Sequence, residues 1–217
     1  MKVLTFRGGV HPRYFKDISV REPLRAAPLS DGYVVPLSQH VGAPNAPVVK
    51  KGDAVKEGQI IGKSDSFVSS PVHSPVSGKV SDIKKAFHPS LGPVLSVFIE
   101  RDKDAEPVKY DEQDIEGLSP EDLISRVRDA GIVGMGGAAF PTHVKLTPPE
   151  GVKIRDLIIN GAECEPYLTC DHAVMTRKTH EVLKGIELLI RILRPERTYI
   201  AIEDNKKAAI FAFQKAI

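Results

Sequence analysis

The sequence predicts a two-domain protein in which a small all-β domain is followed by an incomplete α/β domain. Across residues 36–101, short apolar segments alternate with turn residues at regular spacing, as in small β domains. Across residues 119–217, helix-like and strand-like segments alternate, which favours a parallel sheet. Residues 102–118 are polar, charged and without periodicity, and we interpret them as a linker.

The composition excludes several classes of function. Thirty basic and 28 acidic residues leave a net charge of +2, so no nucleic-acid partner is expected. The longest apolar run, residues 186–193, contains Glu187 and Arg191 and is far shorter than the ~18 residues of a spanning helix. The N-terminus lacks the apolar core of a signal peptide. We therefore expect a cytosolic or peripheral chain, whose association with a membrane would require a partner.

Lysines are locally dense at three places in the sequence. They occur at Lys50–Lys51, Lys84–Lys85 and Lys206–Lys207. Such pairs usually belong to solvated faces, and we expect these to be exposed.

The N-terminal half divides into an arm and the β domain. Residues 1–35 are predicted to be an arm without one regular element, because Pro12, Pro23 and Pro28 interrupt it. The strand-like pieces that follow are Ala46–Val49, Gln59–Ile61, Val76–Val80 and Val94–Ile99.

The C-terminal half begins with a well-marked helix. Ser119 is a typical N-cap, Pro120 occupies the first turn, and acidic residues follow at the positive end of the helix dipole. The elements expected after it are a strand at 156–159, a helix at 171–193, a strand at 198–202 and a helix from 205 onward. Two strands make a poor sheet, so we expect this domain, 119–217, to be truncated.

Residues 36–101 resemble the biotinyl/lipoyl carrier domain, a small barrel-sandwich. The resemblance rests on Val49–Gln59 (VKKGDAVKEGQ) and Ser74–Val80 (SPVSGKV). Carriers attach their cofactor to a lysine eight residues before the proline of the second motif, and here that position is Phe67. Phenylalanine cannot form the amide link, so the expected role is docking or scaffolding.

Two motifs, one rich in glycine and one acidic, predict a ligand site. Gly131–Lys145 (GIVGMGGAAFPTHVK) is backbone bare enough to approach a bulky ligand and to direct N–H groups at it. Asn160–Pro166 (NGAECEP) places an amide and two carboxylates after an apolar strand. Neither the dinucleotide fingerprint nor the phosphate-loop lysine is present. Together the motifs favour a large, flat, phosphorylated ligand.

The combination of these motifs resembles the flavin site of the NADH-oxidising subunit of respiratory complex I. The sequence resembles the C-subunit family of the Rnf electron-transport complex more closely still. The motifs shared with that family are FRGGVHP, GGAAFPTHVKL, LIINGAECEPYLTCDH and YIAIEDNK. This resemblance covers essentially the whole chain. It implies a Rossmann-like flavin-binding fold for 119–217, with FMN and NADH as its ligands.

The resemblance also implies roles for individual residues. Gly134, Gly136 and Gly137, with Ala138 beside them, would lie against FMN, and Lys145 would reach its polar edge or phosphate. Asn160 and Glu163 would hydrogen-bond ring or ribityl groups, and Phe140 and Glu165 would bind the nicotinamide dinucleotide. Simpler interpretations stay open: Phe140 as core, Lys145 as a solvated lysine, Glu165 as a turn residue and Asn160 as a strand-end cap.

The chain departs from the related patterns at four positions. Ala139 replaces a third glycine, Met135 an arginine, Ala162 an acidic residue and Cys164 a glycine. His143 is a feature of the Rnf branch and is not expected to be catalytic.

The resemblance implies electron transfer between NADH and ferredoxin through FMN and 4Fe–4S clusters, within an ion-pumping complex at the cytoplasmic face of the membrane. Expected partners are its other subunits and, indirectly, ferredoxin or flavodoxin. Cys164 and Cys170 cannot hold a cluster, so the clusters would lie outside this fragment; the two thiols are either structural or line a redox site. No catalytic side chain and no metal ligand is predicted. The alternative is a docking module that binds no flavin.

Overall fold

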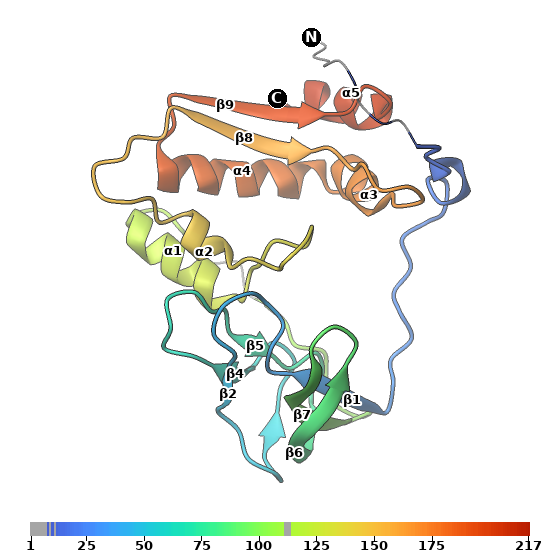
Figure 1. The fold of residues 1–217 in the computed structure, drawn as a ribbon, viewed down its shortest axis with the longest axis vertical. Helices are drawn as coiled ribbons and strands as arrows, with labels where there is room; N and C mark the ends of the chain where they lie inside the picture. Colours follow the sequence, from blue (N-terminus) through green and yellow to red (C-terminus); the bar gives the residue numbers. More distant parts are fainter. Residues whose placement is uncertain (1–7, 9, 11, 111–113) are drawn as a thin grey trace. The chain divides into compact units, whose positions relative to one another are not determined.

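The computed structural model describes residues 8, 10, 12–110 and 114–217 and forms two compact units (Figure 1). One, the barrel unit, comprises Pro28–Glu150. The other, the α/β unit, joins Met1–Ala27 to Gly151–Ile217. Within the described part of the chain, no helix has the length and apolar character needed to cross a membrane.

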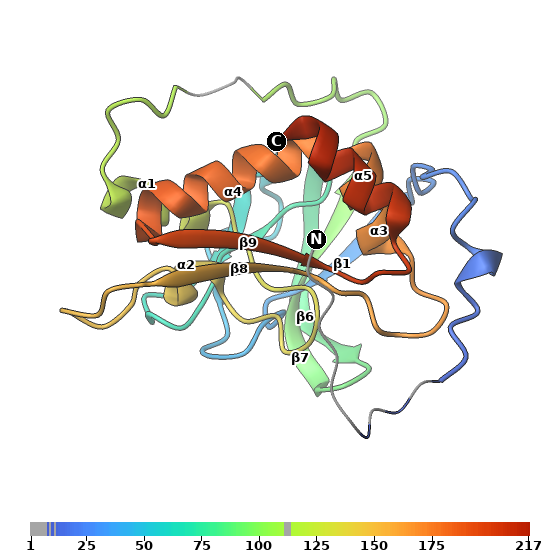
Figure 2. The ribbon, with the colours of Figure 1, turned by 90° about the horizontal axis from the view of Figure 1, so that it is seen from above.

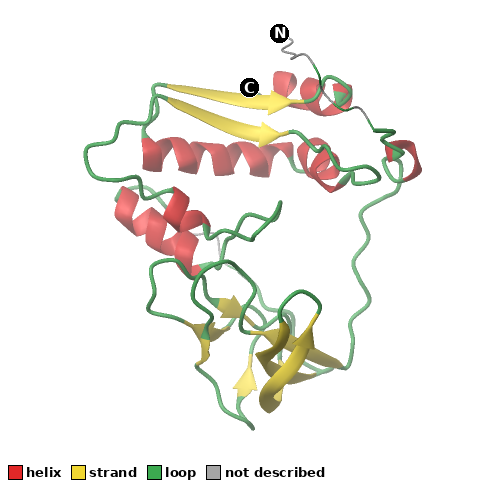
Figure 3. Ribbon diagram, viewed as in Figure 1, coloured by secondary structure: helices red, strands yellow, loops and turns green. Residues whose placement is uncertain are grey.

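The barrel unit is built from two small antiparallel sheets (Figure 3). One has the order β1-β7-β6-β3 and the other the order β2-β4-β5. The strands are β1 Gly32–Pro36, β2 Ala46–Pro47, β3 Ala54–Val55, β4 Ile60–Lys63, β5 Val72–His73, β6 Gly78–His88 and β7 Gly92–Arg101. Side chains from the strands and from the segments between them form one apolar core, whose buried members are Val35, Leu37, Val49, Val55, Ile61, Val72, Val76, Val80, Val97 and Ile99.

The first strand begins inside the segment predicted to be an arm. Residues 1–35 do not form one regular element in the described part of the chain, but β1 begins at Gly32 and pairs with β7 along its length. Tyr33 faces Ile99 and Val35 faces Val97 across this ladder. The partner strand lies more than sixty positions away in the sequence, so local turn signals could not reveal the pairing.

Helix α1, Pro120–Asp129, begins as the sequence predicts. The Ser119 hydroxyl accepts a hydrogen bond from the Asp122 N–H at 3.1 Å, and the Asp122 carboxylate accepts one from the Ser119 N–H at 3.0 Å. This capping box satisfies N–H groups that have no partner inside the helix. The prediction of Ser119 as the N-cap is confirmed.

Helices α1 and α2, the latter Thr142–Lys145, hold the loop at 64–67 in the barrel unit. The Arg128 guanidinium donates to the carbonyl oxygens of Ser64 and Ser66, each at 3.3 Å. The buried His143 ring lies edge-on to the Phe67 ring, and its Nε2 lies 2.8 Å from the Phe67 carbonyl oxygen. Neighbouring helices therefore hold the loop that carries the position modified in carriers.

The α/β unit contains a parallel pair of strands, as predicted. Strand β8, Asp156–Gly161, pairs in parallel with β9, Arg197–Ile202. Figures 1 and 2 show helix α4, Thr179–Leu193, running along this pair. The other elements are η1 Lys16–Ile18, α3 Cys170–Arg177 and α5 Lys207–Ala216. Met175, Ala209 and Phe213 form the core, against which Val182, Leu183, Ile200 and Ile202 pack.

The helix expected at 171–193 is two helices, so that prediction is wrong. The backbone breaks at Lys178, where φ is −126° and ψ is 33°. The hydroxyls of Thr176 and Thr179 donate to the carbonyl oxygens of His172 and Met175, at 2.8 and 2.7 Å. Threonine hydroxyls that bond to the preceding turn bend helices, which accounts for the break. The apolar periodicity continues across it and conceals it in the sequence.

The compact units divide the chain differently from the boundaries expected along the sequence. Residues 119–150 belong to the barrel unit, and the arm up to Ala27 belongs to the α/β unit. The described residues of 102–118 contain no helix or strand. The functional boundaries 1–35, 36–101, 102–118 and 119–217 stay a prediction.

Candidate functional site

The glycine-rich loop is closed at its base by backbone pairing. The Gly134 N–H donates to the Phe140 carbonyl oxygen at 2.9 Å, and the Thr142 N–H donates to that of Ile132 at 3.0 Å. Val133 and Pro141 form an antiparallel bridge between these two bonds. The loop is thus a short projection with a fixed stem, and α2 follows it directly.

One glycine at the stem is required by close neighbours. A β-carbon on Gly131, where φ is +70°, would lie 2.8 Å from the His73 ring and 2.9 Å from the Pro71 carbonyl oxygen. A β-carbon on Gly134 would lie 3.4 Å from the Lys145 Nζ, which is an ordinary contact distance. The Lys145 ammonium therefore lies beside the loop at Gly134. Among the described residues, no carboxylate lies within ion-pair distance of this ammonium.

The tip of the loop is open. Added β-carbons at Gly136 and Gly137 would meet no atom within 4 Å, and both residues are exposed together with Ala138. Phe140 is 38% exposed, so it is not a core side chain. The loop therefore carries open backbone and an exposed ring, and the Lys145 ammonium lies beside Gly134. Ligand binding by Gly134, Gly136, Gly137, Ala138, Phe140 and Lys145 stays a prediction.

Ala139, which stands where the related families have a glycine, adopts a backbone conformation that favours glycine. Its φ is +51°, in the left-handed region that side chains disfavour. The departure from the related pattern therefore places strain in the loop.

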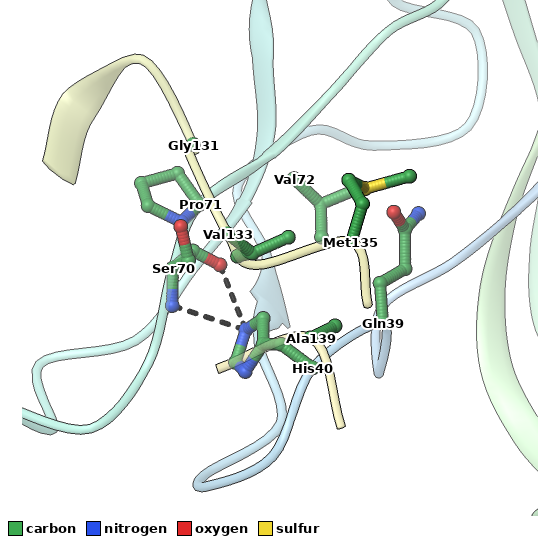
Figure 4. A pocket seen from close by; sticks show the side chains of 9 residues that line it. All are labelled: Gln39, His40, Ser70, Pro71, Val72, Gly131, Val133, Met135 and Ala139. Carbon is green, nitrogen blue, oxygen red and sulfur yellow. Dashed lines mark hydrogen bonds between the residues drawn. The ribbon is translucent and has the colours of Figure 1, made fainter. Parts of the chain in front are cut away.

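A cavity of about 220 Å³ lies between the loop and the barrel (Figure 4). His40 lines it, and the Nε2 of its ring lies 3.0 Å from the Ser70 backbone nitrogen. Its other lining residues are Gln39, Ser70, Pro71, Val72, Gly131, Val133, Met135 and Ala139. Ligand pockets usually hold about 300 Å³ or more, and none of the predicted contact residues lines this one. The cavity is therefore not the predicted site.

The acidic segment lies in the α/β unit, where Asn160 and Gly161 are the last two residues of β8 and the rest follows the strand. The Asn160 side-chain oxygen accepts the Ala162 N–H at 3.0 Å, which is the strand-end cap anticipated as the simpler interpretation. Its amide group has no hydrogen-bond partner in the described residues. Glu165 is exposed.

Glu163 is 2% exposed, and both oxygens of its carboxylate accept hydrogen bonds from residues of the same unit. Its Oε1 accepts the Asp171 N–H at 2.8 Å, and its Oε2 lies 2.8 Å from the Lys206 Nζ and 3.8 Å from the Lys16 Nζ. Burial acts to raise the pKa of this carboxyl, but the hydrogen bond and charge of Lys206, together with the hydrogen bond from the Asp171 N–H, outweigh burial, so the pKa is lowered. Glu163 is held ionised by structural contacts.

Two lysines of this site were missed by sequence reasoning. Lys206 was expected to be exposed as part of a lysine pair, yet it is 4% exposed and forms a buried ion pair with Glu163. Lys16 is also buried. The sequence carries no signal for this pairing, because the burial of Glu163, which creates the need for a cation, appears only when the fold is known.

The two cysteines are exposed and free. The pKa of the Cys170 thiol is raised by partial burial and by the negative charge of Asp171. A reactive thiol has a lowered pKa, so Cys170 does not fit a nucleophilic redox role. Its sulfur, with the carboxylates of Glu163 and Asp171, forms a cluster in which no ion is needed, since Lys206 already balances Glu163.

The comparisons with known proteins agree with this architecture. Residues 4–104 match the family described as RnfC Barrel sandwich hybrid domain, and residues 127–217 match the Nuo51 FMN-binding domain. These matches define a class of protein in which a barrel-sandwich precedes an FMN-binding domain of the complex I type. The chain belongs to the RnfC family and corresponds to its N-terminal part.

Curated relatives support the assignment. The chain is 46% identical over 214 residues to the C subunit of the proton-translocating ferredoxin:NAD(+) oxidoreductase complex of Clostridium ljungdahlii, covering 98% of this chain and 47% of the relative. It is 44% identical over 215 residues to the corresponding Na(+)-translocating protein of Acetobacterium woodii, covering 98% and 48%. The C subunit of an ion-translocating oxidoreductase complex of Haemophilus influenzae is 43% identical over 219 residues, covering 100% and 34%. The chain thus spans at most about half the length of these relatives.

Proposed function

We propose that this chain forms the FMN- and NADH-binding part of a membrane-associated complex that couples electron transfer between NADH and ferredoxin to ion transport. The supporting observation is the open glycine-rich loop with the Lys145 ammonium beside Gly134, within residues that match an FMN-binding domain. The printed names of the relatives support the wider role. The proposed partners are other subunits and, indirectly, ferredoxin or flavodoxin, at the cytoplasmic face of the membrane.

The loop residues fit a flavin phosphate and ring. Gly136 and Gly137 leave open space for a flat group, and the N–H groups of the loop tip can donate to an anion. Lys145 supplies a positive charge without a competing carboxylate among the described residues. Phe140 is exposed and can stack on a ring and exclude water. When bound, FMN would accept a hydride from NADH and release single electrons to 4Fe–4S clusters, which we place outside this chain.

The acidic segment fits a more limited role. The exposed carboxylate of Glu165 and the amide group of Asn160 can contact a nucleotide. Both oxygens of the Glu163 carboxylate are already occupied, so we propose that it orders the segment, whereas the resemblance implies direct contact with flavin.

A titration that compares FMN with riboflavin tests the proposal. We expect saturable quenching of FMN fluorescence, and we expect Lys145→Ala to weaken FMN binding by about tenfold or more, because a charge-assisted hydrogen bond to phosphate is lost. Riboflavin lacks the phosphate, so its weaker binding should not change. Lys85→Ala, which removes an exposed charge from β6, is the matched control. Wild-type protein that binds neither flavin would contradict the proposal and favour the docking module.

A further inference from the structure

The N-terminal arm places one ammonium group in a ring of oxygens. The Lys16 Nζ donates to the carbonyl oxygens of Glu163 at 2.6 Å, Glu165 at 2.9 Å and Leu168 at 2.8 Å. One oxygen of the Glu163 carboxylate lies 3.8 Å away. Lys16 is 9% exposed. All three protons of the ammonium can thus be used, and all by carbonyl oxygens of residues 163–168.

Carbonyl oxygens that converge on one point repel each other unless a cation lies between them. In potassium-channel filters a bound ion offsets this repulsion, and the carbonyl oxygens replace its hydration shell. Here Lys16 supplies the cation as part of the chain. A buried lysine is tolerated only when its charge and protons are satisfied, and this arrangement satisfies both.

Further contacts join the arm to the same segment. The Tyr167 N–H donates to the Tyr14 carbonyl oxygen at 2.8 Å, and the Ser19 hydroxyl donates to the Tyr167 carbonyl oxygen at 2.7 Å. The rings of Phe15 and Tyr167 stack, with centroids 5.1 Å apart. Both residues have left-handed backbones, with φ of 49° and 69°. Such conformations persist only where surrounding contacts impose them.

We infer that Lys16 is a positioning residue: its ammonium acts as a tethered monovalent cation that orders residues 163–168. Its effect on nucleotide binding rests on the proposed function, because the ordered segment carries Glu165 and follows Asn160. The cation site itself does not depend on that function.

Chemical rescue tests this inference. In Lys16→Ala, we expect the amide hydrogens of Tyr167 and Asp171 to exchange at least about tenfold faster, since a charged hydrogen-bonding group is lost. Propylammonium, which replaces the missing atoms, or potassium should restore slow exchange in a saturable manner. Tetramethylammonium, which cannot donate hydrogen bonds, should not. In Lys16→Met, the side chain fills the space, so no cation should restore slow exchange.

The outcomes separate the inference from the proposed function. Lys207→Ala, next to Lys206 but exposed, is the control and should exchange like the wild type. Unchanged exchange in Lys16→Ala, or no rescue by either cation, would overturn the inference. If the rescue succeeds, FMN affinity should fall about tenfold in Lys16→Ala and recover with propylammonium. Rescue of exchange in a chain whose wild type binds no FMN would confirm the cation site and reject the flavin function.

Discussion

At the scale of single residues, the glycine-rich loop shows how backbone conformation and chemistry are linked. Gly134 lies beside the Lys145 ammonium, and an added β-carbon there would make only an ordinary contact with it, at 3.4 Å. Ala139 is forced into a left-handed conformation that glycine adopts freely. Sequence comparison marks both positions as glycine sites of the related families, but only the dihedral angle shows that the methyl group of Ala139 causes strain.

Restoring the glycine should stabilise the barrel unit. Ala139→Gly removes the left-handed strain but adds chain entropy to the unfolded state, so we expect a net gain of about 0.5–1 kcal/mol in the free energy of unfolding. Ala138→Gly is the matched control. Ala138 has no positive φ, so this change should lower stability by about 0.5–1 kcal/mol. Urea unfolding measures both, and equal losses in the two variants would contradict the strain at Ala139.

At the scale of elements, the start of α1 was predictable and the break between α3 and α4 was not. The capping box requires only residues within four positions of each other, Ser119 to Asp122. The break at Lys178 depends on threonine hydroxyls that choose backbone acceptors in the preceding turn. The apolar stripe of 171–193 is compatible with one helix or two.

The cap of α1 makes a measurable contribution. Ser119→Ala should lower the free energy of unfolding by about 1 kcal/mol, because the Asp122 N–H loses its acceptor. Ser125→Ala, at an exposed position inside the same helix, should leave stability unchanged or raise it slightly, since alanine has the higher helix propensity. Thermal unfolding followed by circular dichroism compares the two. If Ser119→Ala lowers the free energy of unfolding no more than Ser125→Ala does, the predicted contribution of the cap is wrong.

At the scale of the whole molecule, one carboxylate joins four elements of the α/β unit. Glu163 follows β8, Asp171 lies in α3, Lys206 precedes α5, and Lys16 belongs to the arm. Removing one partner of a buried ion pair is strongly destabilising. The integrity of this unit therefore depends on the ionisation of Glu163.

This dependence predicts a loss of stability in acid. The pKa of Glu163 is lowered in the folded state, so its contribution is complete above the ordinary value of 4.5 and is lost as the pH falls through the folded-state pKa. The pKa of His172 is lowered by burial and by the Lys206 charge, so its contribution is lost as the pH falls below 6.5. Asp171, whose pKa is raised by burial and by the Glu163 charge, acts in the opposite direction. We expect the first two to dominate.

Urea unfolding at several pH values checks this prediction. Glu163→Gln should cost about 3–5 kcal/mol at pH 7 and should reduce the pH dependence below 4.5. Glu165→Gln, which neutralises an exposed carboxylate of the same segment, should change neither quantity appreciably. If Glu163→Gln does not fold, the wild-type curve remains decisive, and stability that does not fall from pH 7 to below 4.5 would contradict the prediction.

The sequence by itself determined the fold class, the parallel pairing of the two C-terminal strands, the N-cap of α1 and the family. These follow from periodicity, capping residues and contiguous motifs, which are local properties of a chain. The candidate flavin contacts came from the resemblance, and their roles stay predictions. Only the tertiary structure decided that Glu163 is held by Lys16 and Lys206, that Ala139 is strained, and that the arm packs against the acidic segment. The physical reason is that burial and pairing of charge depend on residues far apart in the sequence, which meet only when the chain folds.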